Sequence, residues 1–157
     1  MKRLVLDTNI AIDALVLRKP FGSLAQLVLG LGELGEFELW MSTSQATDVY
    51  YILANHENGD RIKAKQQLAA LRQFVHMRAL LEDDIDAALA SNWDDFEDAC
   101  VYQAALHVKP DAIVTNNVKD FDRSSIPVFD CQGLFDWIEE KEGISYAELA
   151  FGGGEGE

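Results

Sequence analysis

The stretch Leu4-Val5-Leu6-Asp7-Thr8-Asn9 decides the fold of this chain. Its three apolar residues favour a strand buried on both faces, and the polar residues after them favour the start of a helix. We expect Thr8 or Asn9 to cap a helix over residues 10–17. A buried strand that runs directly into a helix predicts a β-α unit, with Asp7 at the carboxyl end of the strand.

Strand-like and helix-like segments alternate along the rest of the chain. The pattern predicts strands over residues 37–41, 112–115 and 127–129, and helices over 23–34, 45–55, 61–81, 83–91 and from 94 to about 107. Alternation of this kind indicates a mainly parallel sheet with helices on both faces and right-handed crossovers.

Length and composition indicate one globular domain. The chain has 157 residues, of which 48% are hydrophobic, so one core can bury most of the apolar surface. We assign residues 1–150 to this domain and expect the glycine-rich tail, 151–157, to be disordered. No segment has the roughly 20 apolar residues of a membrane helix or the apolar core of a signal peptide, so we expect a cytoplasmic protein without membrane contact.

The charge balance is strongly acidic, with 27 acidic and 13 basic residues and a net charge of −14. Such a surface repels a polyanion, which argues against non-specific binding of nucleic acid. It does not exclude an enzyme that acts on nucleic acid, because a divalent metal can supply local positive charge. Five basic residues fall in one segment, and we interpret them as a solvated helix surface: Arg61, Lys63, Lys65, Arg72 and Arg78.

Polar residues gather where ligands bind in an open parallel sheet, beyond the carboxyl ends of its strands. Several carboxylates brought together there would repel one another without a cation, and they are the ligands that Mg²⁺ and Mn²⁺ prefer. Helix capping explains some of these acids individually, but an acid after a buried strand must be paired, solvated or bound to a cation. The candidate residues are Asp7, Asp48, Asp95, Asp98, Thr115, Asn117 and Asp120.

Three segments, 4–9, 94–99 and 113–121, resemble in sequence and in order the motifs of the PIN domain family, which includes the VapC-type toxin ribonucleases. The resemblance covers residues 1 to about 130. It implies a three-layer α/β/α sandwich and a ribonuclease that depends on Mg²⁺ or Mn²⁺. It further implies the toxin of a toxin-antitoxin pair, with RNA as substrate, a small antitoxin protein as partner and frequent homodimers.

The resemblance also implies roles for particular residues. Asp7 matches the first acid of the family and Asp98 the third, whereas the second, usually Glu, is Asp48 here. The fourth, often an Asp two residues after the Thr, is Asn117, which leaves Asp120 as the nearest carboxylate. The implied metal ligands are Asp7, Asp48, Asp98 and Asn117; the implied catalytic residues are Asp7, Asp48, Asp98 and Asp120; and Asn9, Thr115 and Asp95 would support them.

Two other interpretations stay open at this point. The departures at Asp48 and Asn117 and the acidic surface also fit a PIN-like module that binds RNA or protein with weak or absent catalysis. A phosphatase of the haloacid-dehalogenase type also begins with an Asp after a strand, but it requires a second Asp two residues on, where this chain has Asn9. If the protein is a toxin, its −14 charge fits a basic antitoxin.

Overall fold

The computed structural model describes residues 1–146 of the chain. Its sheet consists of β1 (Lys2–Leu6), β2 (Phe37–Ser42), β3 (Val75–Arg78), β4 (Ala112–Val114) and β5 (Val128–Phe129). The order is β3-β2-β1-β4-β5, and every neighbouring pair is parallel. The strand that opens the chain therefore lies at the centre of the sheet. The predicted tail, 151–157, lies outside the described residues.

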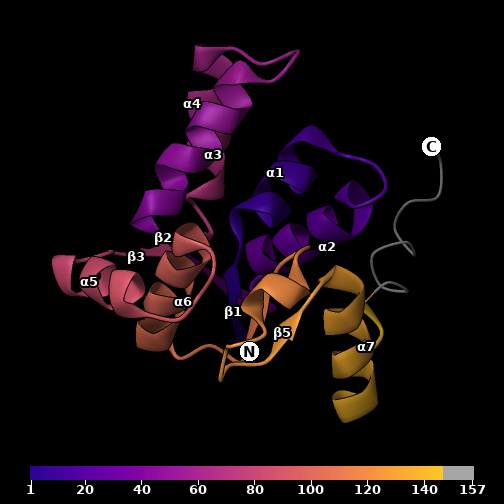
Figure 1. Ribbon diagram of the computed structural model, residues 1–157. Helices are drawn as coiled ribbons and strands as arrows, with labels where there is room; N and C mark the ends of the chain where they lie inside the picture. The colour runs from indigo at the N-terminus through magenta and orange to yellow at the C-terminus, as the bar shows by residue number, and fades with distance from the viewer. Residues whose placement is uncertain (147–157) are drawn as a thin grey trace.

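Helices cover both faces of this sheet, as Figure 1 shows. They are α1 (Thr8–Val16), α2 (Gly22–Glu33), α3 (Thr43–Asn55), α4 (Arg61–Leu71), α5 (Glu82–Ala90), α6 (Phe96–Val108) and α7 (Cys131–Glu142), with a 3₁₀ turn η1 (Val118–Phe121). Helices α1, α2 and α7 share a core with one face, α6 packs on the other, and α5 packs on α6. Helices α3 and α4 pair into a hairpin that extends from the sheet. The architecture is the expected α/β/α sandwich.

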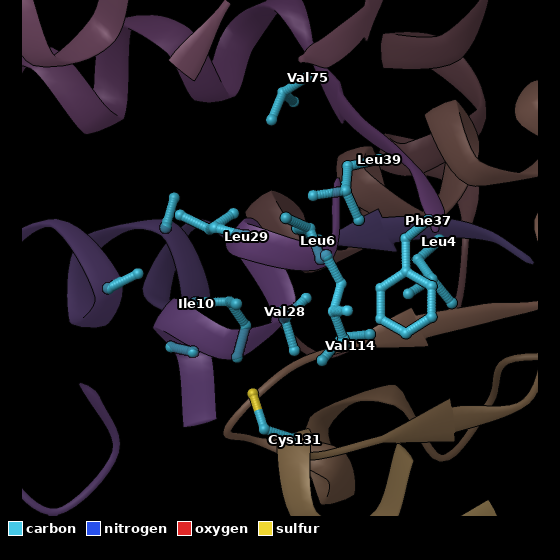
Figure 2. Packing of buried hydrophobic residues seen from close by; sticks show 14 of the residues in the cluster. Leu4, Leu6, Ile10, Val28, Leu29, Phe37, Leu39, Val75, Val114 and Cys131 are labelled. Carbon is cyan, nitrogen blue, oxygen red and sulfur yellow. The ribbon is translucent and has the colours of Figure 1, made fainter. Parts of the chain in front are cut away.

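Alternate residues of the central strands supply the two cores. Leu4 and Leu6 of β1 lie in the larger cluster, on the side of α1 and α2, and Figure 2 shows them among Ile10, Val28 and their neighbours. Val5, between them, packs in the smaller cluster with Val101 of α6. Because successive side chains of a strand point to opposite faces, three adjacent apolar residues serve both layers.

The predicted helix over residues 61–81 is wrong. Helix α4 ends at Leu71, and β3 follows and pairs with β2, with Leu39 opposite Val75. The apolar residues near 75 fit a helical period as well as a short buried strand, and the edge of β2 decides between them by offering backbone partners. The sequence interpretation also lacked α7, which packs Leu134 and Ile138 into the larger core.

Two predicted caps can be compared with the structure. Asp7, and not Thr8 or Asn9, is the N-cap of α1, and its side chain accepts a hydrogen bond from the Thr8 amide. For α3, the sequence offers Ser42, Thr43 and Ser44 as candidate caps before a helix over 45–55. Ser42 is the N-cap, and it forms a capping box with Gln45. The cap of α1 is therefore the same carboxylate that ends β1.

Within residues 1–146, every helix is too short or too polar to cross a lipid bilayer.

Candidate active site

Asp7 lies at the end of the central strand and is almost fully buried, with 7% of its surface exposed. Its amide donates to the carbonyl of Val114, which places the ends of β1 and β4 side by side. One carboxylate oxygen, Oδ1, accepts from the Thr8 amide at 2.8 Å. The backbone of both strands thus fixes the position of this carboxylate.

The other oxygen of Asp7, Oδ2, is held by two side chains. Thr115, which directly follows β4, donates its hydroxyl to Oδ2 at 2.7 Å, and Asn9 donates its amide at 3.3 Å. The same Thr115 hydroxyl accepts from the Asn117 amide at 3.0 Å. Thr115 and Asn9 therefore orient Asp7, in the positions where the sequence placed supporting residues.

The start of α6 brings a second group of acids to this edge. Asp95 is the N-cap of α6, and its side chain accepts from the amide of Asp98 at 2.9 Å. Glu97 and Asp98 lie in the first turn, where the positive end of the helix dipole favours carboxylates.

These groups surround one pocket of about 370 Å³. Asp7 and helix α1 form one side, and the start of α6 forms another. The segment after β4 and Ile52 of α3 complete the wall. Among residues 1–146, six carboxylates line the pocket and one basic side chain, Arg18, does so. The acids are Asp7, Asp13, Asp95, Glu97, Asp98 and Asp120, and Asn9 and Asn117 are also in the wall.

Burial, and to a lesser extent the charges of neighbouring acids, raises the pKa of Asp7 and Asp98 in this pocket. Partial burial raises the pKa of Asp98 from 3.8 to about 7, and the charges of Asp7, Asp95 and Asp120 add to the rise. Burial likewise raises the pKa of Asp7, against the hydrogen bonds from Thr115 and Thr8. Without a cation the pocket therefore binds protons at a pH where ordinary carboxylates are ionised.

The donors fit a hard divalent cation in their chemistry, because they are carboxylate and amide oxygens. Among residues 1–146, no three acidic, histidine or cysteine side chains converge closely enough to hold a metal ion. Carboxylates that repel one another are expected to lie apart when no positive charge is present. Burial raises the pKa of Asp98 most, and the charges of the neighbouring acids raise it further. A bound cation would offset both effects and would bring these carboxylates closer together.

Most of the predicted site residues meet at this pocket, and Asp48 is the exception. Asp7, Asn9, Asp95, Asp98, Asn117 and Asp120 are in its wall, and the fully buried Thr115 lies directly behind Asp7. Asp48, on α3, is not part of the wall. It lies beside Glu97, whose pKa is raised first by burial and then by the charge of Asp48 and a side-chain hydrogen bond with it.

The sequence interpretation did not include Glu97, Asp13 or Arg18. Glu97 stands inside the segment already quoted as a motif, one residue before Asp98, and could have been found there. Asp13 follows Asn9 by four residues, so the helical period of α1 places both on one face. Arg18 follows the end of α1, and no sequence signal connects it with the pocket.

The sandwich topology and the pocket beyond its central strands define an α/β protein with an acidic site at the carboxyl edge of a parallel sheet. A sequence model of the PIN domain matches residues 3–119, and this chain belongs to the PIN domain family. The family consists of nucleases. No curated protein sequence matches the chain significantly.

Several solved structures resemble this one. A chain of VapBC2 from Rickettsia felis, bound to a DNA fragment from its promoter, aligns with a TM-score of 0.56 and 15% identity over 82% of this chain and 97% of that chain. A chain of FitAB bound to an IR36 DNA fragment aligns with a TM-score of 0.57 and 16% identity, over 82% of this chain and 94% of that chain. A chain of FitAcB from Neisseria gonorrhoeae aligns with a TM-score of 0.57 and 15% identity, over 82% of this chain and 98% of that chain. At these identities the likeness shows the fold.

Proposed function

We propose that this protein is an endoribonuclease that hydrolyses RNA phosphodiesters with Mg²⁺ or Mn²⁺ bound in the acidic pocket. The observation that carries the proposal is the pocket itself: among the described residues, six carboxylates line it beyond the central strands of a PIN domain. Burial, together with the charges of neighbouring acids, raises the pKa of Asp98 there to about 7. Carboxylates that bind protons this readily are stabilised strongly when a divalent cation replaces the protons.

Asp7 and Asp98 are the first ligands that we assign to the cation, with Asn117 contributing an amide oxygen. A divalent cation bound there would lower the pKa of the attacking water and offset charge on the phosphate. Thr115 and Asn9 keep the Asp7 carboxylate oriented, and Asp98 or Asp120 accepts the proton of the water. Asp48 acts through Glu97, which lines the pocket and whose pKa is raised by burial and by the charge of Asp48.

Cleavage of labelled single-stranded RNA, with and without Mn²⁺, tests this function. Asp7→Asn keeps the size of the side chain and its place at the N-cap but removes the charge, so cleavage should fall by at least about 100-fold while the fold persists. Asp86→Asn removes an acid on the exposed side of α5 and should cleave as the wild type does. Equal cleavage by the Asp7→Asn protein would overturn the proposal, and a DNA strand of the same sequence tests the preference for RNA.

The alternative function is a PIN-like module that binds RNA or protein without cutting. The observation that favours it is the lack, within the described residues, of three acids that already converge, together with the amide at Asn117. Calorimetry separates the two: heat of Mn²⁺ binding at millimolar concentration supports the nuclease, and its absence supports the module.

We also infer that the protein is the toxin of a toxin-antitoxin pair. The net charge of −14 and the acidic pocket favour a small basic antitoxin, which would place a cationic side chain among the carboxylates. Co-purification with the product of the neighbouring reading frame, followed by loss of cleavage in the complex, is the expected result. A homodimer is expected as well, and sedimentation equilibrium would give a mass of about twice 17.5 kDa.

A further inference from the structure

Asp13 is the most unusual group in the pocket that the proposed chemistry leaves unused. It lies on α1 with 0% of its side chain exposed. One carboxylate oxygen, Oδ2, accepts a hydrogen bond from the side-chain amide of Asn116, but Oδ1 has no hydrogen-bond partner among the described residues. A buried charge without a partner is costly, so a nearby cation is needed to offset it.

Arg18 is that cation. Its Nη1 lies 3.8 Å from Oδ1 of Asp13, which is close enough for charge attraction and too far for a hydrogen bond. Its guanidinium also lies over the ring of Phe21, with 5.9 Å between the guanidinium carbon and the ring centroid. The carboxylate and the ring together hold the head of Arg18 in the wall of the pocket.

The guanidinium keeps its donors free for a ligand. The Arg18 side chain is 62% exposed, and its N–H groups have no protein partner among residues 1–146 within hydrogen-bond distance. A guanidinium presents five N–H donors in a planar fork that matches the oxygens of a phosphate. Arg18 is also the only basic residue that lines the pocket within the described part of the chain, while six acids there repel a polyanion.

We propose that Arg18, held by Asp13, binds a phosphate group of the RNA strand at the acidic pocket. Arg18 contacts the substrate, and Asp13 is a positioning residue that acts through it. In this assignment the Asp13 carboxylate serves as the counter-charge of Arg18. This inference rests on the proposed function, which identifies the ligand as RNA. It assigns to Arg18 the positive charge that lets a polyanion bind at a negatively charged pocket.

RNA binding without cleavage tests this inference separately from the nuclease activity. The measurement is the fluorescence anisotropy of a labelled single-stranded RNA of about 12 nucleotides with Mn²⁺, in an Asp98→Asn background in which cleavage is impaired. Arg18→Gln should weaken binding about fivefold to tenfold, and it should reduce the slope of log K against log salt by about 0.7 to 1, the value for one phosphate contact.

The neighbouring Lys19→Gln is the matched control. Lys19 is also exposed and carries the same charge, but it does not line the pocket, so binding should change less than about twofold. Arg18→Lys should restore part of the affinity and the full salt slope, because the charge remains while the fork is lost. Asp13→Asn should weaken binding in the same direction but less than Arg18→Gln.

Several outcomes would overturn the inference. Equal losses in Arg18→Gln and Lys19→Gln would show a general effect of charge and not a phosphate contact at the pocket. An unchanged affinity in Arg18→Gln, or no RNA binding at all in the background protein, would contradict it directly. Because binding is measured without cleavage, these results differ from failure of the nuclease proposal, in which the wild type does not cut RNA.

Discussion

Thr115 joins the ends of the two central strands by a single hydroxyl. It donates to Asp7 at the end of β1 and accepts from the amide of Asn117 in the loop after β4, and it is fully buried. Buried hydrogen-bond partners cannot turn to water when the bond is lost, so such a group contributes both to stability and to the orientation of the site.

Thr115→Val is therefore expected to lower the free energy of unfolding by about 1–3 kcal/mol, because Val keeps the shape and removes the hydroxyl. Cleavage of RNA should fall as well, since Asp7 loses a hydrogen bond that orients it. Urea denaturation measures the first effect. Thr47→Val removes an exposed hydroxyl that bonds within α3, and it should cost less than about 0.5 kcal/mol. Equal costs for the two variants would contradict the role of Thr115.

The raised pKa of Asp98 predicts how the free energy of unfolding depends on pH. Its pKa is raised to about 7 in the folded protein, so between the unfolded value of 3.8 and 7 the folded state binds more protons than the unfolded state. Without divalent metal, the contribution of Asp98 therefore favours folding at low pH and is lost as the pH rises toward 7. The carboxylate remains ionised and unfavourably placed above that pH.

The matched measurement is the melting temperature of the wild type and Asp98→Asn from about pH 4.5 to 8 in EDTA. Asn cannot ionise, so the variant should gain stability relative to the wild type as the pH increases, with most of the gain below about pH 7. Adding Mn²⁺ at a pH above that range should stabilise the wild type more than the variant. A difference between the two proteins that does not vary with pH would refute the raised pKa.

At the scale of elements, α2 approaches β2 closely at a glycine. A Cβ built on Gly32 would overlap the side chain of Leu39, which is itself fully buried in β2. Gly30, on the same helix, has no atom within 4 Å of the corresponding position. Substitutions at these two glycines therefore distinguish the effect of packing against the sheet from the effect of helix propensity.

Gly32→Ala should lower the free energy of unfolding by about 1–3 kcal/mol, because Leu39 must move within a packed core. Gly30→Ala should raise it by up to about 1 kcal/mol, since Ala favours a helix and meets no neighbour. Chemical denaturation of both variants gives the comparison. The role of Gly32 in this helix-sheet contact would be refuted if the two substitutions changed stability in the same direction and by similar amounts.

Elements were predictable where local signals decide them. The run Leu4-Val5-Leu6 indicated a central strand, and Ser42 was recognisable as a cap before α3. The strand after α4 was not, because residues 75–78 fit a helical period and become a strand only through pairing with β2. Short strands at the edge of a sheet depend on partners distant in sequence, which local patterns do not contain.

At the scale of the molecule, strand order brings the candidate site together. Segments around residues 7, 98 and 117 meet because β1 and β4 are neighbours and α6 leads into β4. The sequence predicted this gathering from the rule that ligands bind beyond the carboxyl ends of parallel strands. It could not give the position of Asp48 beside Glu97, or the pairing of Asp13 with Arg18, because both depend on how helices pack and not on the strands.

The most direct test of the central claim is a crystal of the wild-type protein soaked in millimolar Mn²⁺ and measured for anomalous scattering. We predict a peak in the acidic pocket within about 2.5 Å of carboxylate oxygens of both Asp7 and Asp98, with the acids closer together than in the metal-free protein. A pocket without anomalous density at that concentration, in a crystal where Asp7 and Asp98 are well ordered, would contradict the claim that these carboxylates form a metal centre.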